Sequence, residues 1–160
     1  AEMLRLDNFH GAYSFITALN SAPVQRLKRS MALINPKKII ILEDLRRMFR
    51  PDKSCQSMRQ AMNIAKSPCI PHLGIFLGDL TVVDEFESKI GDMINFRKCR
   101  RIAGIIERLL EYQAKAYEFR RVDALADHFA ELPGRLSRTG AIAQSKLVEQ
   151  RVKHTKRAGN

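Results

Sequence analysis

The residues that could do chemistry lie at the end of one long apolar run. Residues 73–83 are mostly apolar or small, and Asp84 and Glu85 follow them directly. So continuous an apolar run predicts a helix that lies in the core of the fold. The helix dipole disfavours a carboxylate at the C-terminal end by about 0.3–1 kcal/mol. Two carboxylates at this end are usually a solvated helix terminus, but their unfavourable place weakly indicates a function.

Other chemistry is not indicated by the sequence. It contains no Gly-rich phosphate loop, no Ser-His-Asp order typical of a hydrolase, and no carboxylate pair spaced for hydrolysis. Cys55, Cys69 and Cys99 have neither CxxC spacing nor histidines at metal-ligand intervals. We therefore expect no metal and no cofactor. An odd number of cysteines argues against a disulfide framework and favours a reducing compartment such as the cytoplasm.

Two predicted helices would carry these carboxylates. Pro68 and Pro71 can each occupy the first turn of a helix, so the first helix is expected to open there. About ten polar residues follow it, and a second amphipathic helix begins near Asp92 or Asn95. Helices joined by a short loop usually pack against each other. The sequence therefore predicts a helical hairpin over about residues 68–117.

The rest of the chain also has helical periodicity. Upstream we expect helices within residues 2–19, with a break at His10-Gly11, and helices after Asn20-Ser21-Ala22-Pro23, after Asn35-Pro36 and from Asp52 or Ser54. Downstream we expect a break over 113–120, a short helix from Asp123 to Pro133-Gly134, a last helix over 139–152, and a basic disordered tail over 153–160. No segment alternates as a strand does. The predicted fold is all-α, an irregular helical bundle with a protruding helical hairpin.

The chain is strongly basic, with 28 Lys and Arg against 17 Asp and Glu, a net charge of +11. Such a charge attracts acidic partner surfaces or an anionic membrane. Nucleic acid is the alternative, but the basic residues are spread over many elements and accompany no nucleic-acid-binding signature. We therefore expect no nucleic-acid binding. The longest apolar stretch is too short to cross a membrane, which predicts a soluble protein.

Two long motifs resemble those of a known family. Residues 68–85 read PCIPHLGIFLGDLTVVDE and residues 94–113 read INFRKCRRIAGIIERLLEYQ. Both are similar to the helical hairpin of the Ras-family guanine-nucleotide exchange factor (RasGEF) catalytic domain. Upstream, residues 8–11 and 18–28 resemble the NFNG and ALNSSPVxRLK stretches of the same family. The resemblance covers about residues 1–152, which we interpret as a RasGEF-like domain that lacks its N-terminal part.

The resemblance implies a function. In this family the hairpin opens the nucleotide site of a Ras, Rap or Ral-like small GTPase, and two residues of its first helix act there. At the matching positions this chain has Thr81 and Glu85, four residues apart and hence on one helix face. The implied protein is an exchange factor rather than an enzyme of covalent chemistry. It works from the cytoplasm and is recruited to the membrane.

Further positions match residues that contact the GTPase in the family. They are Asn20, Gln25, His72, Leu73, Phe76, Asp84 and Arg101. Leu73 and Phe76 are as well explained by core packing, and Asn20 by a helix cap.

An alternative function stays open at this point. His72 stands where many members have an aromatic residue, and Phe86-Glu87 replace the usual Gly-Asn. These departures fit a catalytically weak or inactive interaction module, an adaptor with the same fold. We also expect the apolar faces that the missing helices would cover to promote self-association.

Overall fold

The structure is a computed structural model that describes residues 2–131 and 138–150. Apart from one small sheet, the regular elements of this part of the chain are helices, which confirms the all-α prediction. The elements are α1 (Glu2–Arg5), α2 (Phe9–Leu19), α3 (Ala22–Gln25), α4 (Lys28–Ala32), α5 (Pro36–Met48), the 3-10 helix η1 (Asp52–Ser54), α6 (Gln56–Ile64), α7 (Leu73–Asp84), β1 (Lys89–Ile90), β2 (Met93–Ile94), α8 (Phe96–Glu111), α9 (Asp123–Glu131) and α10 (Arg138–Val148). The turn at 133–134 and the tail over 153–160 lie outside the described residues.

Within the described residues the chain forms two compact units. The first unit takes in the chain up to Ile16 and Ile40–Glu118, and the second takes in Thr17–Ile39 and the chain from Phe119 on. The prediction of one domain over 1–152 stays a prediction.

The core of the first unit is built from one apolar face of each helix. Phe9, Ala12 and Ile16 follow one another at helical spacing along α2, and Met58 and Met62 do so along α6. α7, α8 and the segment before α7 supply the remaining side chains, with Phe49 following α5. These are Phe49, Cys69, Ile75, Phe76 and Tyr112. The base of α7 is therefore anchored in this core.

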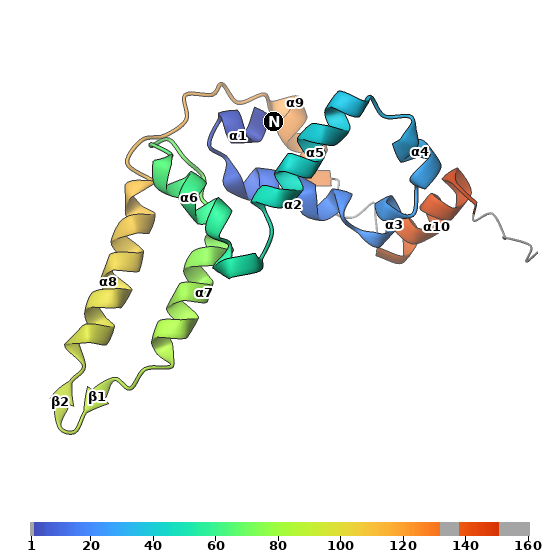
Figure 1. Ribbon diagram of the computed structural model, residues 1–160. Helices are drawn as coiled ribbons and strands as arrows, with labels where there is room; N and C mark the ends of the chain where they lie inside the picture. The colour runs from blue at the N-terminus through green and yellow to red at the C-terminus, as the bar shows by residue number, and fades with distance from the viewer. Residues whose placement is uncertain (1, 132–137, 151–160) are drawn as a thin grey trace, which may run out of the picture. The chain divides into compact units, whose positions relative to one another are not determined.

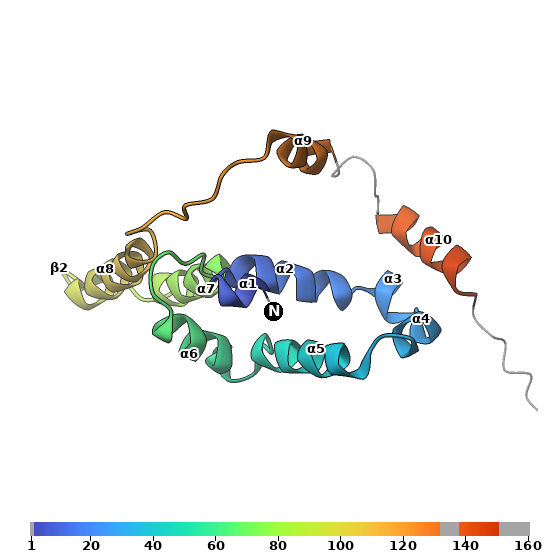
Figure 2. The same ribbon diagram turned by 90° about the horizontal axis from the view of Figure 1, so that it is seen from above.

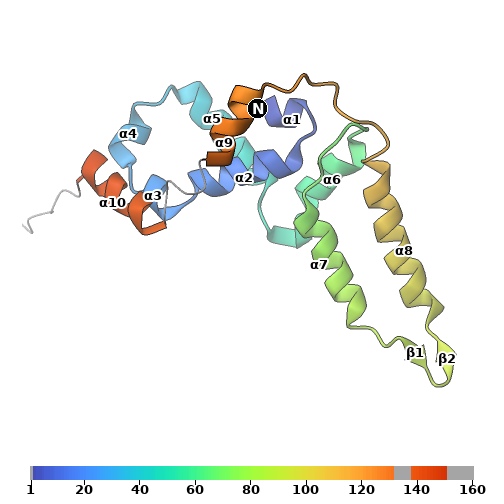
Figure 3. The same cartoon turned by 180° about the vertical axis from the view of Figure 1, so that it is seen from behind.

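α7 and α8 lie side by side and run in opposite directions (Figure 1). β1 and β2 join them at the end far from α6, as the view from behind also shows (Figure 3), and Figure 2 views the arm from above. We call residues 73–111 the α7–α8 arm, and residues 84–96 its tip. No residue of the tip belongs to the core of the first unit or packs against it.

α7 begins later than its prolines suggested. Pro68 and Pro71 precede the helix, which starts at Leu73. The reason is a backbone pairing with the N-terminal segment: the Ile70 N–H donates to the Asp7 carbonyl at 3.0 Å, and the Ile70 carbonyl accepts from the Phe9 N–H at 2.9 Å. This pairing holds the chain extended where the sequence pattern predicted a helix.

α7 is also less buried than a core helix. Ile75, Phe76 and Val83 are buried, whereas Leu73, Leu77 and Val82 are exposed. Only one face of α7 meets the core and α8. The prediction of a core helix was therefore wrong for the described residues. Apolar residues occupy more of the surface of α7 than the neighbouring elements cover.

The tip contains a strand pair that the sequence analysis missed. Lys89 pairs with Ile94 and Ile90 with Met93 in an antiparallel register. Gly91 has φ of +61°, a conformation that favours glycine, and it forms the two-residue turn with Asp92. Strands of two residues are too short to alternate visibly. The Gly-Asp pair was the signal that could have found them.

Several helix ends agree with the prediction and others do not. Asn35 caps α5, since its side-chain oxygen accepts from the Lys37 N–H at 2.9 Å, and Pro36 opens that helix. The break expected at His10-Gly11 lies earlier, over residues 6–8, and the helix expected after Asn20-Ser21-Ala22-Pro23 is divided into α3 and α4. The last helix ends at Val148 rather than at 152.

In the second unit, α10 packs beside α3 (Figure 3). The Arg26 guanidinium donates to the Ser145 carbonyl. The Glu149 carboxylate accepts from the backbone N–H groups of Arg29 and Ser30 at 3.0 and 3.2 Å, which lowers the pKa of Glu149. These contacts hold together two segments of the second unit that lie far apart in the sequence.

Candidate functional site

The end of α7 presents Thr81 and Glu85 on one exposed helix face. Glu85 is the C-cap residue and keeps helical dihedrals, so it continues the face on which Thr81 lies one turn earlier. The Thr81 hydroxyl donates to the Leu77 carbonyl at 2.9 Å. The Glu85 side chain has no hydrogen bond or ion pair within the described residues. An exposed carboxylate without such a partner is available to an external one.

The neighbouring carboxylate is already engaged. Asp84 Oδ1 accepts from the Lys98 ammonium at 3.0 Å, although the Asp84 side chain is mostly exposed. Lys98, on the first turn of α8, is itself only 9% exposed. Its ammonium also donates to the carbonyls of Asp84 and Phe86 and to the Ser88 hydroxyl. The two adjacent carboxylates therefore differ: Asp84 is part of the tip's structure and Glu85 is not.

A second contact joins the tip to α8. The Arg101 guanidinium lies over the Phe86 ring at 5.2 Å from its centroid, a cation–π arrangement. Both side chains are on the exposed part of the arm. Asp84 and Arg101, two of the predicted contact residues, thus lie near Glu85 and both contribute to holding the segment that contains it.

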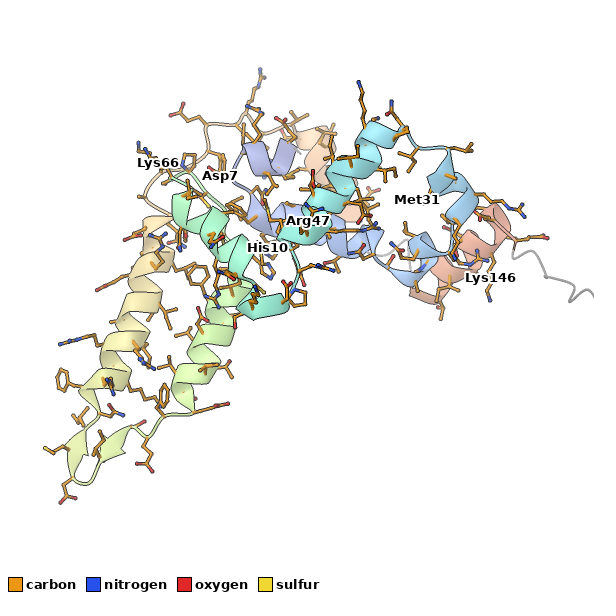
Figure 4. The ribbon with its side chains drawn as sticks, viewed as in Figure 1. Asp7, His10, Met31, Arg47, Lys66 and Lys146 are labelled. Atoms are coloured by element: carbon orange, nitrogen blue, oxygen red, sulfur yellow. The ribbon has the colours of Figure 1, made fainter. Side chains whose placement is uncertain are left out.

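The other predicted residues of the arm, Leu73 and Phe76, lie at its base, which is the end of the arm next to the core of the first unit. Leu73 is exposed, whereas Phe76 is 7% exposed and packs edge-on against the Tyr112 ring. The structure thus gives Phe76 a packing role, which was the alternative interpretation. Its contact with a GTPase stays a prediction. Side chains of both α7 and α8 extend into the space between the two helices (Figure 4).

His72 immediately precedes α7 and is half-buried. The centroid of its ring lies 4.1 Å from the centroid of the Tyr13 ring and 5.9 Å from that of the His10 ring. His10 is labelled in Figure 4. The Nδ1 atom of His72 is buried without a hydrogen-bond partner among the described residues. Burial, and to a smaller extent His10, lowers the pKa of His72, so its imidazole is neutral at physiological pH. The structure places His72 against α2 rather than on an open surface.

Asn20 and Gln25 belong to the second unit. Both are exposed there, and the Gln25 side-chain amide donates to the Leu19 carbonyl at 3.0 Å. Their contact with a partner stays a prediction. Ser21 rather than Asn20 occupies the N-cap position of α3, and its side chain makes no capping hydrogen bond.

A cleft of about 310 Å3 lies between α6, α7 and α8. Its apolar floor includes Ile75, Phe76 and Ile105, and its rim includes Arg100 and Arg108. At one wall the Arg59 guanidinium makes two hydrogen bonds to the Asp79 carboxylate, at 2.7 and 2.6 Å, which join α6 to α7. The sequence analysis missed this ion pair, because its partners lie 20 residues apart and on different helices.

Neither a metal site nor a membrane span is found in the described part of the chain. No group of three or more His, Cys, Asp or Glu residues there could hold a metal ion. No helix among the described residues is long and apolar enough to cross a bilayer.

Comparison with known proteins identifies the family. Residues 1–100 match the RasGEF domain, and this chain belongs to the RasGEF domain family. It is 40% identical over 113 residues to Ras guanine nucleotide exchange factor C of Dictyostelium discoideum, and 34% identical over 119 residues to Ras guanine nucleotide exchange factor efc25 of Schizosaccharomyces pombe. These alignments cover 70% and 72% of this chain.

The chain is also 30% identical over 146 residues to Ras guanine nucleotide exchange factor Y of Dictyostelium discoideum, and this longer alignment covers 90% of the chain. The chain spans only 8%, 12% and 10% of the length of these three relatives. Thr81 and Glu85 lie within the residues that match the family, and Arg101 lies just beyond them.

Proposed function

We propose that this chain is a guanine-nucleotide exchange module for a Ras-family small GTPase, and that the end of α7 enters the nucleotide site. The observation that carries the proposal is the exposed Glu85 carboxylate at the end of α7, without a partner among the described residues, next to an Asp84 carboxylate that is already paired with Lys98. The name that the three relatives share, Ras guanine nucleotide exchange factor, supports a Ras-like partner. Rap and Ral proteins belong in the same test.

The mechanism requires no covalent bond to be made or broken. A GTPase holds its nucleotide through a phosphate cradle and a magnesium ion. Thr81 would crowd the metal position, and the Glu85 carboxylate would take over hydrogen bonds of the cradle. One unit charge at about 4 Å is worth roughly 4 kcal/mol at an effective dielectric of 20. Since this corresponds to about a thousandfold in an equilibrium constant, one glutamate is sufficient to weaken nucleotide binding.

Exchange then follows from differential binding. The module binds the nucleotide-free GTPase more tightly than the loaded one and shifts the population toward release. We place it in the cytoplasm, with recruitment to an anionic membrane through its net charge of +11. Sedimentation with vesicles of neutral and of anionic lipid would test that recruitment.

The decisive experiment measures release of a fluorescent guanine nucleotide from a panel of Ras, Rap and Ral proteins. Glu85→Ala should reduce release strongly while leaving the melting temperature unchanged, because the side chain is exposed and makes no hydrogen bond or ion pair within the described residues. Glu87→Ala is the matched control, since Glu87 is an exposed glutamate two residues later. Equal release by wild type and Glu85→Ala would contradict the role assigned to Glu85.

The alternative is a module that binds a GTPase without releasing its nucleotide. His72, where many members have an aromatic residue, favours it, because its ring packs against Tyr13 within the first unit. In this case a GTPase would bind, as measured by calorimetry, but the nucleotide would be released at the intrinsic rate. The same panel therefore separates the two functions.

A further inference from the structure

The structure points to Lys98 as a positioning residue for nucleotide exchange, one that holds the backbone on both sides of Glu85. This inference rests on the exchange function proposed above. It concerns a residue that would touch neither the GTPase nor the nucleotide. Lys98 would act through Glu85 alone.

The Lys98 ammonium contacts the backbone on both sides of Glu85. Its nitrogen lies 3.0 Å from the Asp84 carbonyl and 2.9 Å from the Phe86 carbonyl, the residues immediately before and after Glu85. It lies 3.0 Å from Asp84 Oδ1 and 3.3 Å from the Ser88 hydroxyl. An ammonium has three N–H groups, so these four acceptors use its whole capacity. Glu85 is thus held between two fixed carbonyls.

The N-cap residue of α8 also fixes the two residues that follow Phe86. The Asn95 side-chain amide donates to the Glu87 carbonyl at 2.7 Å, and the Asn95 backbone N–H donates to the Ser88 carbonyl at 2.9 Å. The Asn95 side-chain oxygen in turn accepts from the Lys98 N–H at 3.2 Å and caps α8. Two residues at the start of α8 therefore bind four of the five carbonyls between Asp84 and Ser88. The carbonyl of Glu85 is the fifth.

The charge of Lys98 also suits its place beside the end of α7. The last carbonyls of a helix lack partners within the helix, and the dipole makes that end negative. Asp84 and Glu85 add two carboxylates to this end of α7, which the dipole disfavours. Lys98 supplies both a donor for the Asp84 carbonyl and a positive charge beside the helix end. It therefore explains how an exposed glutamate can be kept in helical geometry at this position.

The side chain has to be lysine for this arrangement. An ammonium is compact and can direct its hydrogens to acceptors on different sides, whereas a guanidinium is planar and donates as a fork. Methionine has a similar length but no donor. A Lys98→Met change would leave the Asp84 and Phe86 carbonyls without this partner, and residues 84–88 would lose their connection to the Lys98 side chain.

The experiment compares Lys98→Met with Arg97→Met, a neighbouring exposed arginine of α8 for which the structure gives no ion pair in the described residues. Nucleotide release is measured as a function of GTPase concentration. We expect Lys98→Met to lower the maximal rate by roughly ten- to a hundredfold, the size typical of a misplaced catalytic group, with little change in the concentration giving half-maximal rate. Arg97→Met should behave as wild type.

A double-mutant cycle with Glu85→Ala tests whether Lys98 acts through Glu85. If it does, the double variant releases nucleotide as slowly as Glu85→Ala alone, because the loss of Lys98 can no longer misplace a side chain that has been removed. Slower nucleotide release by the double variant than by Glu85→Ala alone would overturn the inference. A wild-type maximal rate for Lys98→Met would also overturn it. Lys98→Gln, which keeps a donor but removes the charge, should fall between wild type and Lys98→Met and serves if Lys98→Met does not fold.

Hydrogen exchange gives a readout that does not depend on activity. The amides of Phe86 and Asn95 donate to the Val83 and Ser88 carbonyls. Their exchange should become faster in Lys98→Met, while the amides of the core helix α6 remain unchanged. If wild type releases no nucleotide but these amides respond, the proposed function fails and the structural role of Lys98 stands. If the amides do not respond, the inference about Lys98 fails.

Discussion

The base and the tip of the α7–α8 arm are held by different kinds of contact. At the base, Phe76 packs against Tyr112, and the Tyr112 hydroxyl donates to the Met62 carbonyl at 2.9 Å within a continuous apolar core. At the tip, large side chains such as Met93 and Phe96 are exposed, and the backbone is held by polar groups of Lys98 and Asn95. The comparison indicates that the base supplies stability and the tip supplies a defined shape.

This division has a physical reason. Burial of apolar surface contributes in proportion to area and needs no particular geometry, so it anchors a helix wherever a core exists. Hydrogen bonds contribute only about 0.5–1.5 kcal/mol each, but they fix direction. An exposed segment is not shaped by burial in the core of its own protein. Its conformation then has to come from a few directed contacts, as residues 84–88 show.

The contrast between the base and the tip is tested most directly by removing a buried side chain from the base. Phe76→Ala should lower the free energy of unfolding by about 3–5 kcal/mol, because it removes a buried aromatic side chain from the core. Leu77→Ala is the neighbouring control, since that leucine is 61% exposed and should change stability by less than about 1 kcal/mol. Urea unfolding followed by circular dichroism measures both. Similar losses for the two variants would mean that the buried face of α7 has been assigned wrongly.

A smaller effect is expected from the ion pair at the base. Arg59 and Asp79 are each about one-third exposed, so solvent screens their attraction in spite of the two short hydrogen bonds. We expect a coupling energy of about 1 kcal/mol or less from the cycle of Arg59→Ala, Asp79→Ala and the double variant. The coupling should decrease in high salt. A coupling of several kcal/mol would show that polar contacts also dominate the base, and would remove the contrast with the tip.

Much of the fold could be predicted because its signals are local. Asn35 with Pro36, and Asn95 before the stripe of α8, are cap residues whose chemistry acts within one turn. The late start of α7 could not be predicted in this way. It depends on the pairing of Ile70 with Asp7 and Phe9, more than 60 residues away in the sequence, and the local pattern of two prolines carries no sign of it.

The candidate site shows the same limit. Glu85 was weakly indicated by its place at a helix end, but its pairing with Thr81 came from the family resemblance and not from periodicity. Lys98 was not singled out, because a lysine among Arg97, Arg100 and Arg101 on an amphipathic helix is usually solvated. Its burial depends on carbonyls contributed by the segment after α7. Only the three-dimensional arrangement brings those groups together.

The smallest predicted effect concerns His72, which lies where the base meets α2. Burial lowers the pKa of His72 below its ordinary value of 6.5. Between the lowered value and 6.5 the unfolded chain binds more protons at this residue than the folded chain, so the free energy of unfolding rises with pH in that interval. The contribution of His72 is therefore complete above pH 6.5 and is lost as the pH falls toward the folded-state value.

We expect wild type to lose more stability than His72→Phe between pH 7 and pH 5, as measured by urea unfolding at each pH. The comparison between variants is needed because carboxylates elsewhere also titrate as the pH falls. His10→Gln should give an intermediate dependence, since the His10 ring stacks on His72 and also lowers its pKa. Phenylalanine can keep the ring contact with Tyr13, so His72→Phe should remain folded at pH 7. If the two pH profiles were parallel, the His72 ring would be solvated, and this edge of the base would resemble the tip in its exposure.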